Sequence, residues 1–264
     1  MFNLTPTVRN LLIANILLLV ISENLFRQLI PIGALFPIGS PFFQPWQFIT
    51  YMFLHSGWGH LISNMFGLIS FGPLLEQRWG GQRFLAFWLI CGFGAGLLYE
   101  GVRYYEIRPI IELQRDLTRN PTGGDFAQLV RTAEPNGFRA AEDMAAATAL
   151  SRNPNDVALR DGIIERTQEI YQEVLSLPMV GASGALFGIL FAFAYLFPNT
   201  ELFLLFFPFP IKAKYFVFFY AMYELYQGVH RTPGDNVAHY AHLGGLLIGF
   251  IIIKFWERGR QQFY

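Results

Sequence analysis

Apolar residues in this chain gather in six runs, and this clustering restricts the fold more than any other feature of the sequence. Hydrophobic residues make up 53% of the 264 residues and charged residues only 14%, whereas charged residues are about a quarter of a typical soluble domain. A membrane-spanning helix needs about 20 mostly apolar residues. The sequence therefore predicts an all-α membrane protein with six transmembrane helices, at about residues 11–30, 60–75, 84–99, 180–197, 215–229 and 239–256.

A polar segment separates the third predicted helix from the fourth. Residues 103–178 hold more than half of the charged residues of the chain and no lysine. Apolar residues at helical spacing predict helices over about 139–152 and 156–177, with Asn155 or Asp156 as the N-cap of the second. We therefore expect a membrane core of helices 1–3 over residues 1–102, an external, mostly helical insertion over 103–178, and a membrane core of helices 4–6 over 179–264.

Lysine and arginine residues in the short loops predict the orientation, because cytoplasmic loops carry an excess of them. With six spans, most of these residues fall on one side: Arg78, Arg83, Lys212, Lys214, Lys254, Arg258 and Arg260. We therefore expect a multi-pass protein of the cell membrane with both termini in the cytoplasm. The first apolar run lacks the features of a cleavable signal peptide, and the apolar stretch 202–209 is too short to span and is expected at the membrane interface.

Polar residues that can transfer protons stand at the starts of three predicted helices. They are Ser183, His242 and His60, and Asn64 follows His60 by one turn. Because these three helices all begin at the external face, the side chains are expected at one depth, roughly 5–10 Å below that surface. Such groups are costly in lipid and mark functional sites. They predict Ser183 as a nucleophile, His242 as its base, and His60, Asn64 and the Ser183 N–H as donors to an oxyanion.

Each of these residues also has a structural interpretation. A serine hydroxyl can bond a carbonyl one turn earlier in its own helix, and closely spaced glycines after Ser183 suit helix packing. However, His242 lies above Gly245 and Gly249 on one helix face, and two glycine-faced helices approach closely enough to bring a serine to an imidazole. No acid accompanies Ser183 or His242 in the sequence, so a Ser-His-Asp triad is not expected.

The remaining histidines suggest no metal centre. His239 and His242 form an H-x-x-H pattern, but a metal site would also need a carboxylate or cysteine ligand. We therefore predict no metal and no cofactor. His239 and His55 are expected in the polar rim of the site, and His230 in solvent. Glu224, within the fifth predicted helix, is expected either to tie helices together or to face water.

The ordered set of motifs resembles the rhomboid family of intramembrane serine proteases. The motifs are Gly-Ala-Ser-Gly around Ser183, Ala-His-x-x-Gly around His242, His-x-x-x-Asn from His60 to Asn64, Glu-x-Arg at 76–78, and a tryptophan in the first loop, Trp46. Two residues depart from the family's pattern. Gln47 stands where the first loop of the family has an arginine, and Phe187 stands where some members carry a tyrosine that stacks on the histidine.

This resemblance implies a rhomboid-like six-helix bundle with a water-accessible cavity on the external side. It implies a dyad of Ser183 and His242, and an oxyanion site of His60, Asn64 and the Ser183 amide. By the same resemblance, Glu76 and Arg78 hold structure, and the fifth helix is the lateral gate for substrate.

We therefore expect an intramembrane serine endopeptidase that hydrolyses peptide bonds in or near the transmembrane segments of membrane proteins. Its expected partners are transmembrane protein substrates and the lipid bilayer, and its zero net charge gives no indication of nucleic acid. The alternative is a catalytically silent rhomboid-like protein that binds client helices without cleaving them. A transporter is disfavoured, because acids paired along a path are not evident in the apolar runs. The sequence predicts neither the substrate nor the oligomeric state.

Overall fold

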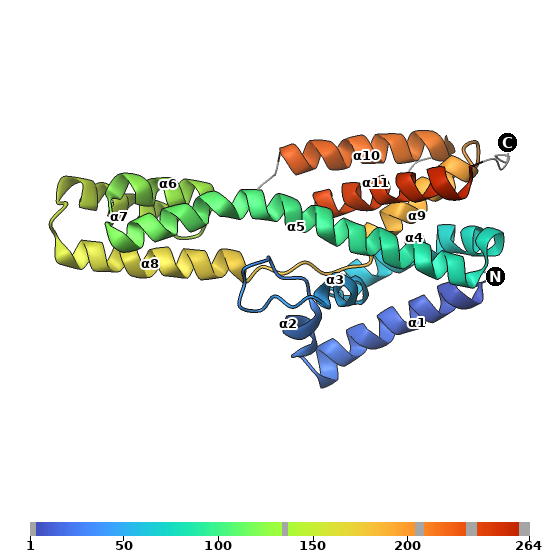
Figure 1. Ribbon diagram of the computed structural model, residues 1–264, viewed down its shortest axis with the longest axis horizontal. Helices are drawn as coiled ribbons and strands as arrows, with labels where there is room; N and C mark the ends of the chain where they lie inside the picture. The colour runs from blue at the N-terminus through green and yellow to red at the C-terminus, as the bar shows by residue number, and fades with distance from the viewer. Residues whose placement is uncertain (1–3, 134–136, 204–208, 231–236, 259–264) are drawn as a thin grey trace. The chain divides into compact units, whose positions relative to one another are not determined.

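Most of the chain is helical in the computed structural model, which describes residues 4–133, 137–203, 209–230 and 237–258 (Figure 1). Three helical stretches of these residues are long and apolar enough to cross a membrane: Pro6–Leu25, Gly81–Arg119 and His239–Trp256. Ser183–Leu196 is a shorter apolar helix. All six predicted spans are helical over most of their length, and three of them meet the length and hydropathy required of a span.

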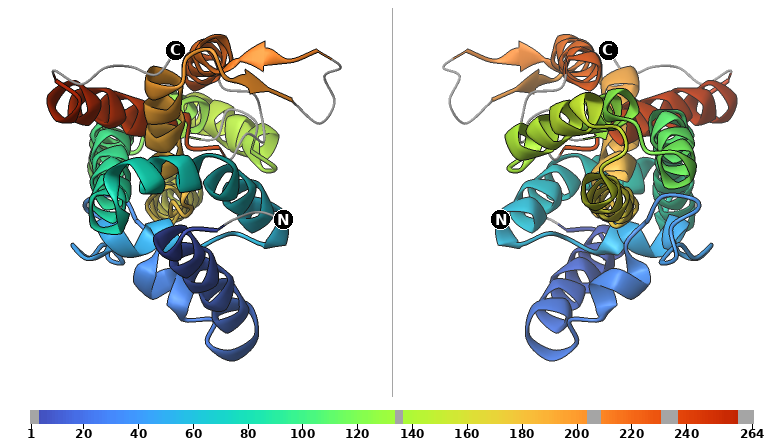
Figure 2. Two further views of the ribbon diagram at one scale, coloured as in Figure 1. Left: turned by 90° about the vertical axis from the view of Figure 1, so that its right-hand side faces the viewer. Right: turned by 90° about the vertical axis from the view of Figure 1, so that its left-hand side faces the viewer.

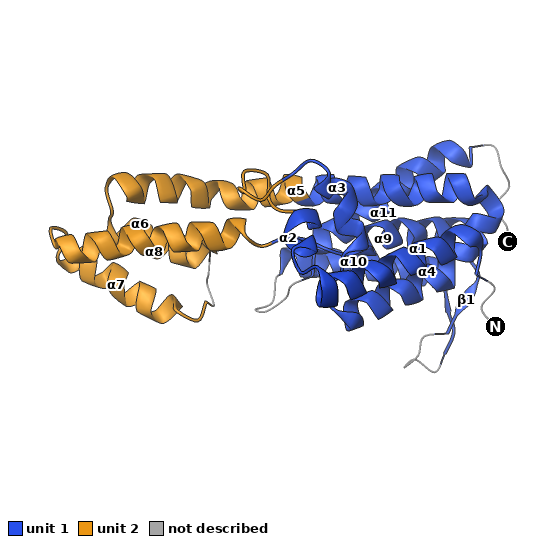
Figure 3. Ribbon diagram, turned by 90° about the horizontal axis from the view of Figure 1, so that it is seen from below, with its two compact units in different colours: residues 1–35, 44–99, 178–264 blue, residues 36–43, 100–177 orange. Residues whose placement is uncertain are grey.

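The chain forms two compact units (Figure 3). The first consists of Met1–Leu35, Gln44–Tyr99 and Pro178–Tyr264, and the second of Phe36–Phe43 and Glu100–Leu177. Helix α5 (Gly81–Arg119) contributes residues to both units. The predicted third span ends at about residue 99, but the helix continues for a further 20 residues. The sequence there changes from apolar to amphipathic, which alters the environment of the helix without ending it.

The long helices of the first unit, besides α5, are α1 (Pro6–Val20), α4 (Trp58–Trp79), α9 (Ser183–Leu196), α10 (Ala213–Val229) and α11 (His239–Trp256). A single π-helical turn, Ile21–Leu25, extends α1. Helix α1 begins earlier than predicted because Pro6 occupies its first turn, where a missing N–H costs no hydrogen bond. Helix α9 begins later than predicted, because Gly181 has φ +125° and lies outside the helical region.

The loop between α1 and α4 is anchored by the residue that departs from the family pattern. It contains α2 (Leu29–Gly33), α3 (Gln47–Thr50) and a 3₁₀ turn, Tyr51–Phe53. The Gln47 side chain is buried, donates to the carbonyl of Ile32 at 3.2 Å and accepts from the N–H of Gln44 at 3.1 Å. A neutral amide therefore anchors the loop without an arginine.

A short hairpin follows α9. Strands β1 (Glu201–Leu202) and β2 (Ile211–Lys212) pair in antiparallel register, with Glu201 opposite Lys212 (Figure 2). The interfacial segment predicted over 202–209 overlaps β1 at Leu202. Residues 204–208 lie outside the described part of the chain, as does Arg260 of the predicted cytoplasmic side.

Hydrogen bonds and an ion pair at the C-terminal end of α4 connect it to the start of α1 and the end of α11. The carboxylate of Glu76 accepts hydrogen bonds from the backbone N–H groups of Thr7 and Val8, at 2.8 and 2.9 Å, and thereby satisfies free donors in the first turn of α1. Arg78 pairs with Glu257 at 2.6 Å, and the indole of Trp79 donates to the same carboxylate at 2.9 Å. These contacts match the structural role that the family resemblance implies for Glu76 and Arg78.

The second unit is built from the end of α5 with α6 (Gly123–Ala133), α7 (Ala140–Arg152) and α8 (Val157–Leu175). The two helices predicted here correspond to α7 and α8, and Asp156 is the N-cap of α8, since its side chain accepts from the N–H of Leu159. Apolar side chains from all four helices form one core, among them Leu117, Phe126, Leu150 and Ile170.

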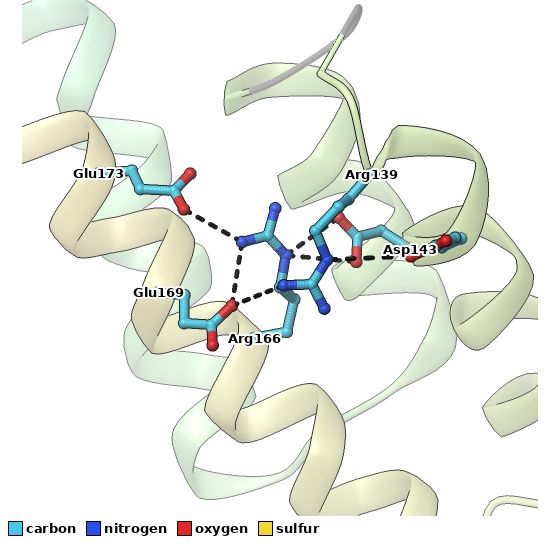
Figure 4. Close-up of polar contacts among 6 residues, drawn as sticks. Arg139, Asp143, Arg166, Glu169 and Glu173 are labelled. Atoms are coloured by element: carbon cyan, nitrogen blue, oxygen red, sulfur yellow. Dashed lines mark hydrogen bonds and ion pairs between the residues drawn. The ribbon is translucent and has the colours of Figure 1, made fainter.

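A buried arginine links α7 and α8 within this unit. Arg166, 7% exposed, pairs with Asp143 at 3.1 Å, Glu169 at 3.1 Å and Glu173 at 3.3 Å, and Arg139 joins the network through Glu169 (Figure 4). Burying a guanidinium is costly unless its donors are paired, and here carboxylates on two helices pair it. The network therefore fixes how α7 meets α8.

Candidate functional site

Ser183 is placed at the end of a helix by the backbone of the residues before it. It is the first residue of α9, with Ala182 as the N-cap and Gly181 in a conformation that favours glycine. The N–H groups of the first helical turn have no acceptor within their own helix. The hydroxyl and the N–H of Ser183 are thus both available to a ligand at the same helix end, and the side chain is only half-buried.

Glycines allow α9 and α11 to touch backbone to backbone. A methyl group on Gly245 would lie 1.8 Å from the carbonyl oxygen of Gly184, and one on Gly249 would lie 2.9 Å from the Cα of Gly188. Neither position tolerates a side chain without moving the helices apart. This contact brings Ser183 Oγ within 2.8 Å of His242 Nε2. Gly245 and Gly249, which the sequence placed on the same helix face as His242, therefore allow α11 to approach α9 closely.

Aromatic packing holds the His242 ring in place. Phe187, one turn after Ser183, stacks on the imidazole with ring centroids 4.2 Å apart and planes 11° from parallel. Phe187 also contacts Tyr220 of α10, with ring centroids 4.8 Å apart. His242 is 7% exposed, so the stack and the two flanking helices leave its ring little freedom. A phenyl ring thus serves where some family members have a tyrosine.

An acid also reaches His242, contrary to the expectation that none accompanies it. Glu224 Oε2, from α10, lies 2.8 Å from His242 Nδ1 and 2.6 Å from His239 Nδ1. Glu224 is 2% exposed. The sequence contained one signal for this residue, an acid alone within an aromatic and apolar helix. It could not show which neighbouring helix the carboxylate faces.

His60 and Asn64 lie beside the approach to Ser183. A methyl group on Gly181 would lie 2.7 Å from His60 Nε2 and 3.6 Å from Asn64 Nδ2, so both side chains point at the backbone two residues before Ser183. Asn64 is buried, and its Nδ2 has no hydrogen-bond partner among the described residues. Buried amide donors are ordinarily paired. An unpaired one here is available to an incoming oxygen.

Two histidines expected in the rim are buried instead. His239 is 5% exposed, at the start of α11, and His55 is 2% exposed, with its ring 5.0 Å from that of His60. Burial, together with the nearby His60, lowers the pKa of His55 to about 3. His230 is exposed, as expected, and stacks on Tyr226.

Glu224, His239 and His242 are also a set of metal-ligand types. Their ligand atoms all lie within 4.8 Å of one another, and Glu224 supplies the carboxylate that the sequence interpretation lacked. Both imidazoles, however, meet the same carboxylate oxygen at hydrogen-bond distance. Hydrogen bonds therefore account for these three side chains without an ion.

The fold and the site together define a helical protein in which a serine hydroxyl contacts an imidazole. Both side chains, Ser183 and His242, lie in the first turn of an apolar helix. The chain belongs to the rhomboid family: the model of the rhomboid domain matches residues 43–106 and 159–257. It is a membrane-embedded protein. The match omits residues 107–158, which lie within the second unit.

Related proteins carry the same family name. An uncharacterized mitochondrial rhomboid protein of Schizosaccharomyces pombe is 29% identical over 232 residues, covering 81% of this chain and 52% of the relative. Rhomboid protein 1, mitochondrial, of Saccharomyces cerevisiae is 39% identical over 89 residues, covering 32% of this chain and 25% of the relative. RHOMBOID-like protein 6, mitochondrial, of Arabidopsis thaliana is 47% identical over 55 residues, covering 21% of this chain and 18% of the relative. The chain thus spans about half or less of the length of these relatives.

Proposed function

We propose that this protein is an intramembrane serine endopeptidase that hydrolyses peptide bonds in or near transmembrane segments of membrane proteins. The observation that carries the proposal is the 2.8 Å contact between Ser183 Oγ and His242 Nε2. A hydroxyl is a weak nucleophile until a base removes its proton, and histidine is the usual base near neutral pH. Family membership supports the same reaction class.

In the proposed mechanism, Ser183 Oγ attacks the carbonyl carbon of the scissile bond while His242 Nε2 accepts the hydroxyl proton. The C–N bond then breaks, and His242 returns that proton to the leaving amine. A water molecule, deprotonated by His242, hydrolyses the resulting ester and regenerates the serine. The half-buried hydroxyl at a helix start suits this chemistry, because water must reach it.

The oxyanion formed in both steps needs hydrogen-bond donors. We assign this role to His60, Asn64 and the N–H of Ser183, which surround the same helix start. Removal of one such donor typically costs about 10²–10³-fold in rate. Asn64 contributes a buried donor that has no partner among the described residues.

The membrane arrangement belongs to the proposal. We propose six spans, α1, α4, α5, α9, α10 and α11, with both termini cytoplasmic, the site open to the external side, and residues 103–178 as an external insertion between two halves of the membrane core. The gap at 107–158 in the family match supports an insertion. We propose the cell membrane as the location; the names of the fungal relatives favour a mitochondrial membrane as the alternative. Fractionation with reporters at each terminus distinguishes them.

A fluorophosphonate probe tests the nucleophile directly. In the purified protein, Ser183 Oγ is expected to displace fluoride from phosphorus and retain the probe, whereas Ser183→Ala is expected to remain unlabelled. Ser63→Ala, an exposed serine of α4, is the matched control and is expected to label normally. Labelling that persists in Ser183→Ala refutes the assignment. A folded protein that neither labels nor cleaves any membrane protein supports the silent, client-binding alternative.

A further inference from the structure

Glu224 is a buried carboxylate that the mechanism above does not use. It lies in the middle of α10, 2% exposed, and contacts two histidines of α11 through one oxygen, Oε2. Its charge is costly in such a place unless hydrogen bonds compensate it. Packing alone does not explain a carboxylate at a buried position where its charge is costly.

The chemistry of the donors determines which nitrogen of each ring carries a proton. An ionised carboxylate only accepts hydrogen bonds, so Nδ1 of His239 and Nδ1 of His242 both donate to Glu224. A neutral imidazole with a proton on Nδ1 has none on Nε2. The Nε2 of His242 is therefore an acceptor, and it faces the Ser183 hydroxyl at 2.8 Å. The carboxylate thus selects the tautomer that a general base requires.

We propose that Glu224 is the positioning residue of the site and completes a Ser183–His242–Glu224 relay, resting on the endopeptidase function proposed above. It fixes the tautomer and the ring orientation of His242. It also stabilises the imidazolium that forms when Ser183 attacks, as the acid of a serine protease triad does. His239 supports the relay by donating a second hydrogen bond to the same oxygen, which compensates the buried carboxylate.

Other groups also lie around His242. Phe187 of α9 and Tyr220 of α10 pack around the ring system, and His60 of α4 interacts electrostatically with His242. Among the described groups that face the ring, Glu224 is the one that supplies negative charge at hydrogen-bond distance from it.

The test is the rate of fluorophosphonate labelling of the purified, full-length protein as a function of pH. Glu224→Gln keeps the shape of the side chain and removes its charge. We expect labelling near neutral pH to slow by about 10²-fold or more. We also expect the acid limb of the profile to move to lower pH, because the imidazolium loses its counter-charge. Glu224→Asp keeps the charge and shortens the reach, so it is expected to slow labelling while the acid limb stays in place.

A matched control separates this role from a tie between helices. Tyr240 of α11 donates to the carbonyl of Gly228 in α10 at 3.0 Å, so Tyr240→Phe removes an α10–α11 hydrogen bond that does not involve His242. It is expected to label within about threefold of the unsubstituted protein. The positioning role is overturned if the labelling rate falls equally in Tyr240→Phe and Glu224→Gln. It is also overturned if the rate falls in Glu224→Gln but the acid limb of its pH profile does not shift. If Glu224→Gln does not fold, an acid limb that moves in Glu224→Asp overturns it instead.

Three further outcomes of the labelling experiment have different meanings. If EDTA abolishes labelling of the unsubstituted protein and Zn²⁺ restores it, the cluster is a metal site and the relay is wrong. If Ser183 labels and Glu224→Gln labels within threefold at every pH, only the relay fails. If Ser183 is not labelled at all, the proposed function itself fails.

Discussion

Ser56 determines which nitrogen of His60 is available to the site. The backbone N–H of Ser56 donates to His60 Nδ1 at 3.4 Å, and the Ser56 hydroxyl lies 3.0 Å from the same atom. A backbone N–H cannot accept, so Nδ1 carries no proton and Nε2 carries one in the neutral ring. His60 therefore presents a donor toward Gly181, whereas His242 presents an acceptor toward Ser183. Two histidines of one site are held in opposite tautomers by their neighbours.

A single residue, His55, also makes the stability of the folded protein depend on pH. Burial lowers the pKa of His55 to about 3, against about 6.5 when unfolded, so the folded protein holds it neutral. The stability that this provides is complete above pH 6.5 and is lost as the pH falls toward 3. Between pH 6.5 and 5 we expect a loss on the order of 2 kcal/mol in the free energy of unfolding.

Thermal unfolding in detergent at those two pH values measures this loss. His55→Phe is expected to reduce the difference between them. His230→Phe is the control, because it also replaces a histidine by phenylalanine but at an exposed position. A pH dependence that is the same in His55→Phe as in the unsubstituted protein contradicts the prediction.

The sequence singled out individual candidate residues but did not predict which side chains surround them. Ser183, His242, His60 and Asn64 were found because polar groups at helix starts stand out in apolar sequence. Glu224 stood out equally, but its partners lie 15 and 18 residues further on, in another helix. Which face of α10 meets α11 depends on tertiary packing, and helical periodicity in an almost wholly apolar helix does not reveal it.

At the scale of helices, the contact between α9 and α11 controls the geometry of the site. Gly245→Ala places a methyl group 1.8 Å from the carbonyl oxygen of Gly184, so the two helices must separate. A displacement of about 1 Å is enough to cost roughly 10²-fold in rate where a reacting geometry is lost. We expect probe labelling of Ser183 to fall by that order. The labelling rate in detergent is the measurement.

Gly101→Ala is the matched control for this substitution. Gly101 lies within α5, and a methyl group there meets open space. Alanine is also the better helix former. Labelling of Gly101→Ala is expected to be unchanged, and an unchanged rate in Gly245→Ala contradicts the proposed packing role.

Helices were easier to predict than their ends. Long apolar runs located the helices of the first unit, because length and hydropathy require no knowledge of partners. The ends depend on local backbone conformation, such as φ +125° at Gly181, or on packing in a different core, as for the continuation of α5. Neither is encoded in hydropathy.

At the scale of the whole molecule, the residues of the candidate site and the residues of the second unit are different sets. Ser183, His242, Glu224, His60 and Asn64 all belong to the first unit, whereas the second has its own core. Phe126 is fully buried in that core. Phe126→Ala is expected to destabilise the second unit by about 3–5 kcal/mol and to leave Ser183 labelling unchanged.

Limited proteolysis within residues 100–177, combined with probe labelling, measures both effects. Phe138→Ala is the control, since Phe138 is fully exposed and its truncation is expected to change neither. Loss of labelling in Phe126→Ala, in parallel with increased cleavage, shows that the site depends on the second unit.

The attachment of Glu224 to α10 constrains the order of events in a catalytic cycle. If a substrate helix enters by moving α10 away from α11, the carboxylate leaves His242 with it. The open state then lacks an oriented base. Entry and hydrolysis are in that case mutually exclusive, so a peptide bond is cut only after α10 has returned. If the proposed endopeptidase function is correct, such an interlock protects passing membrane helices from cleavage during brief encounters.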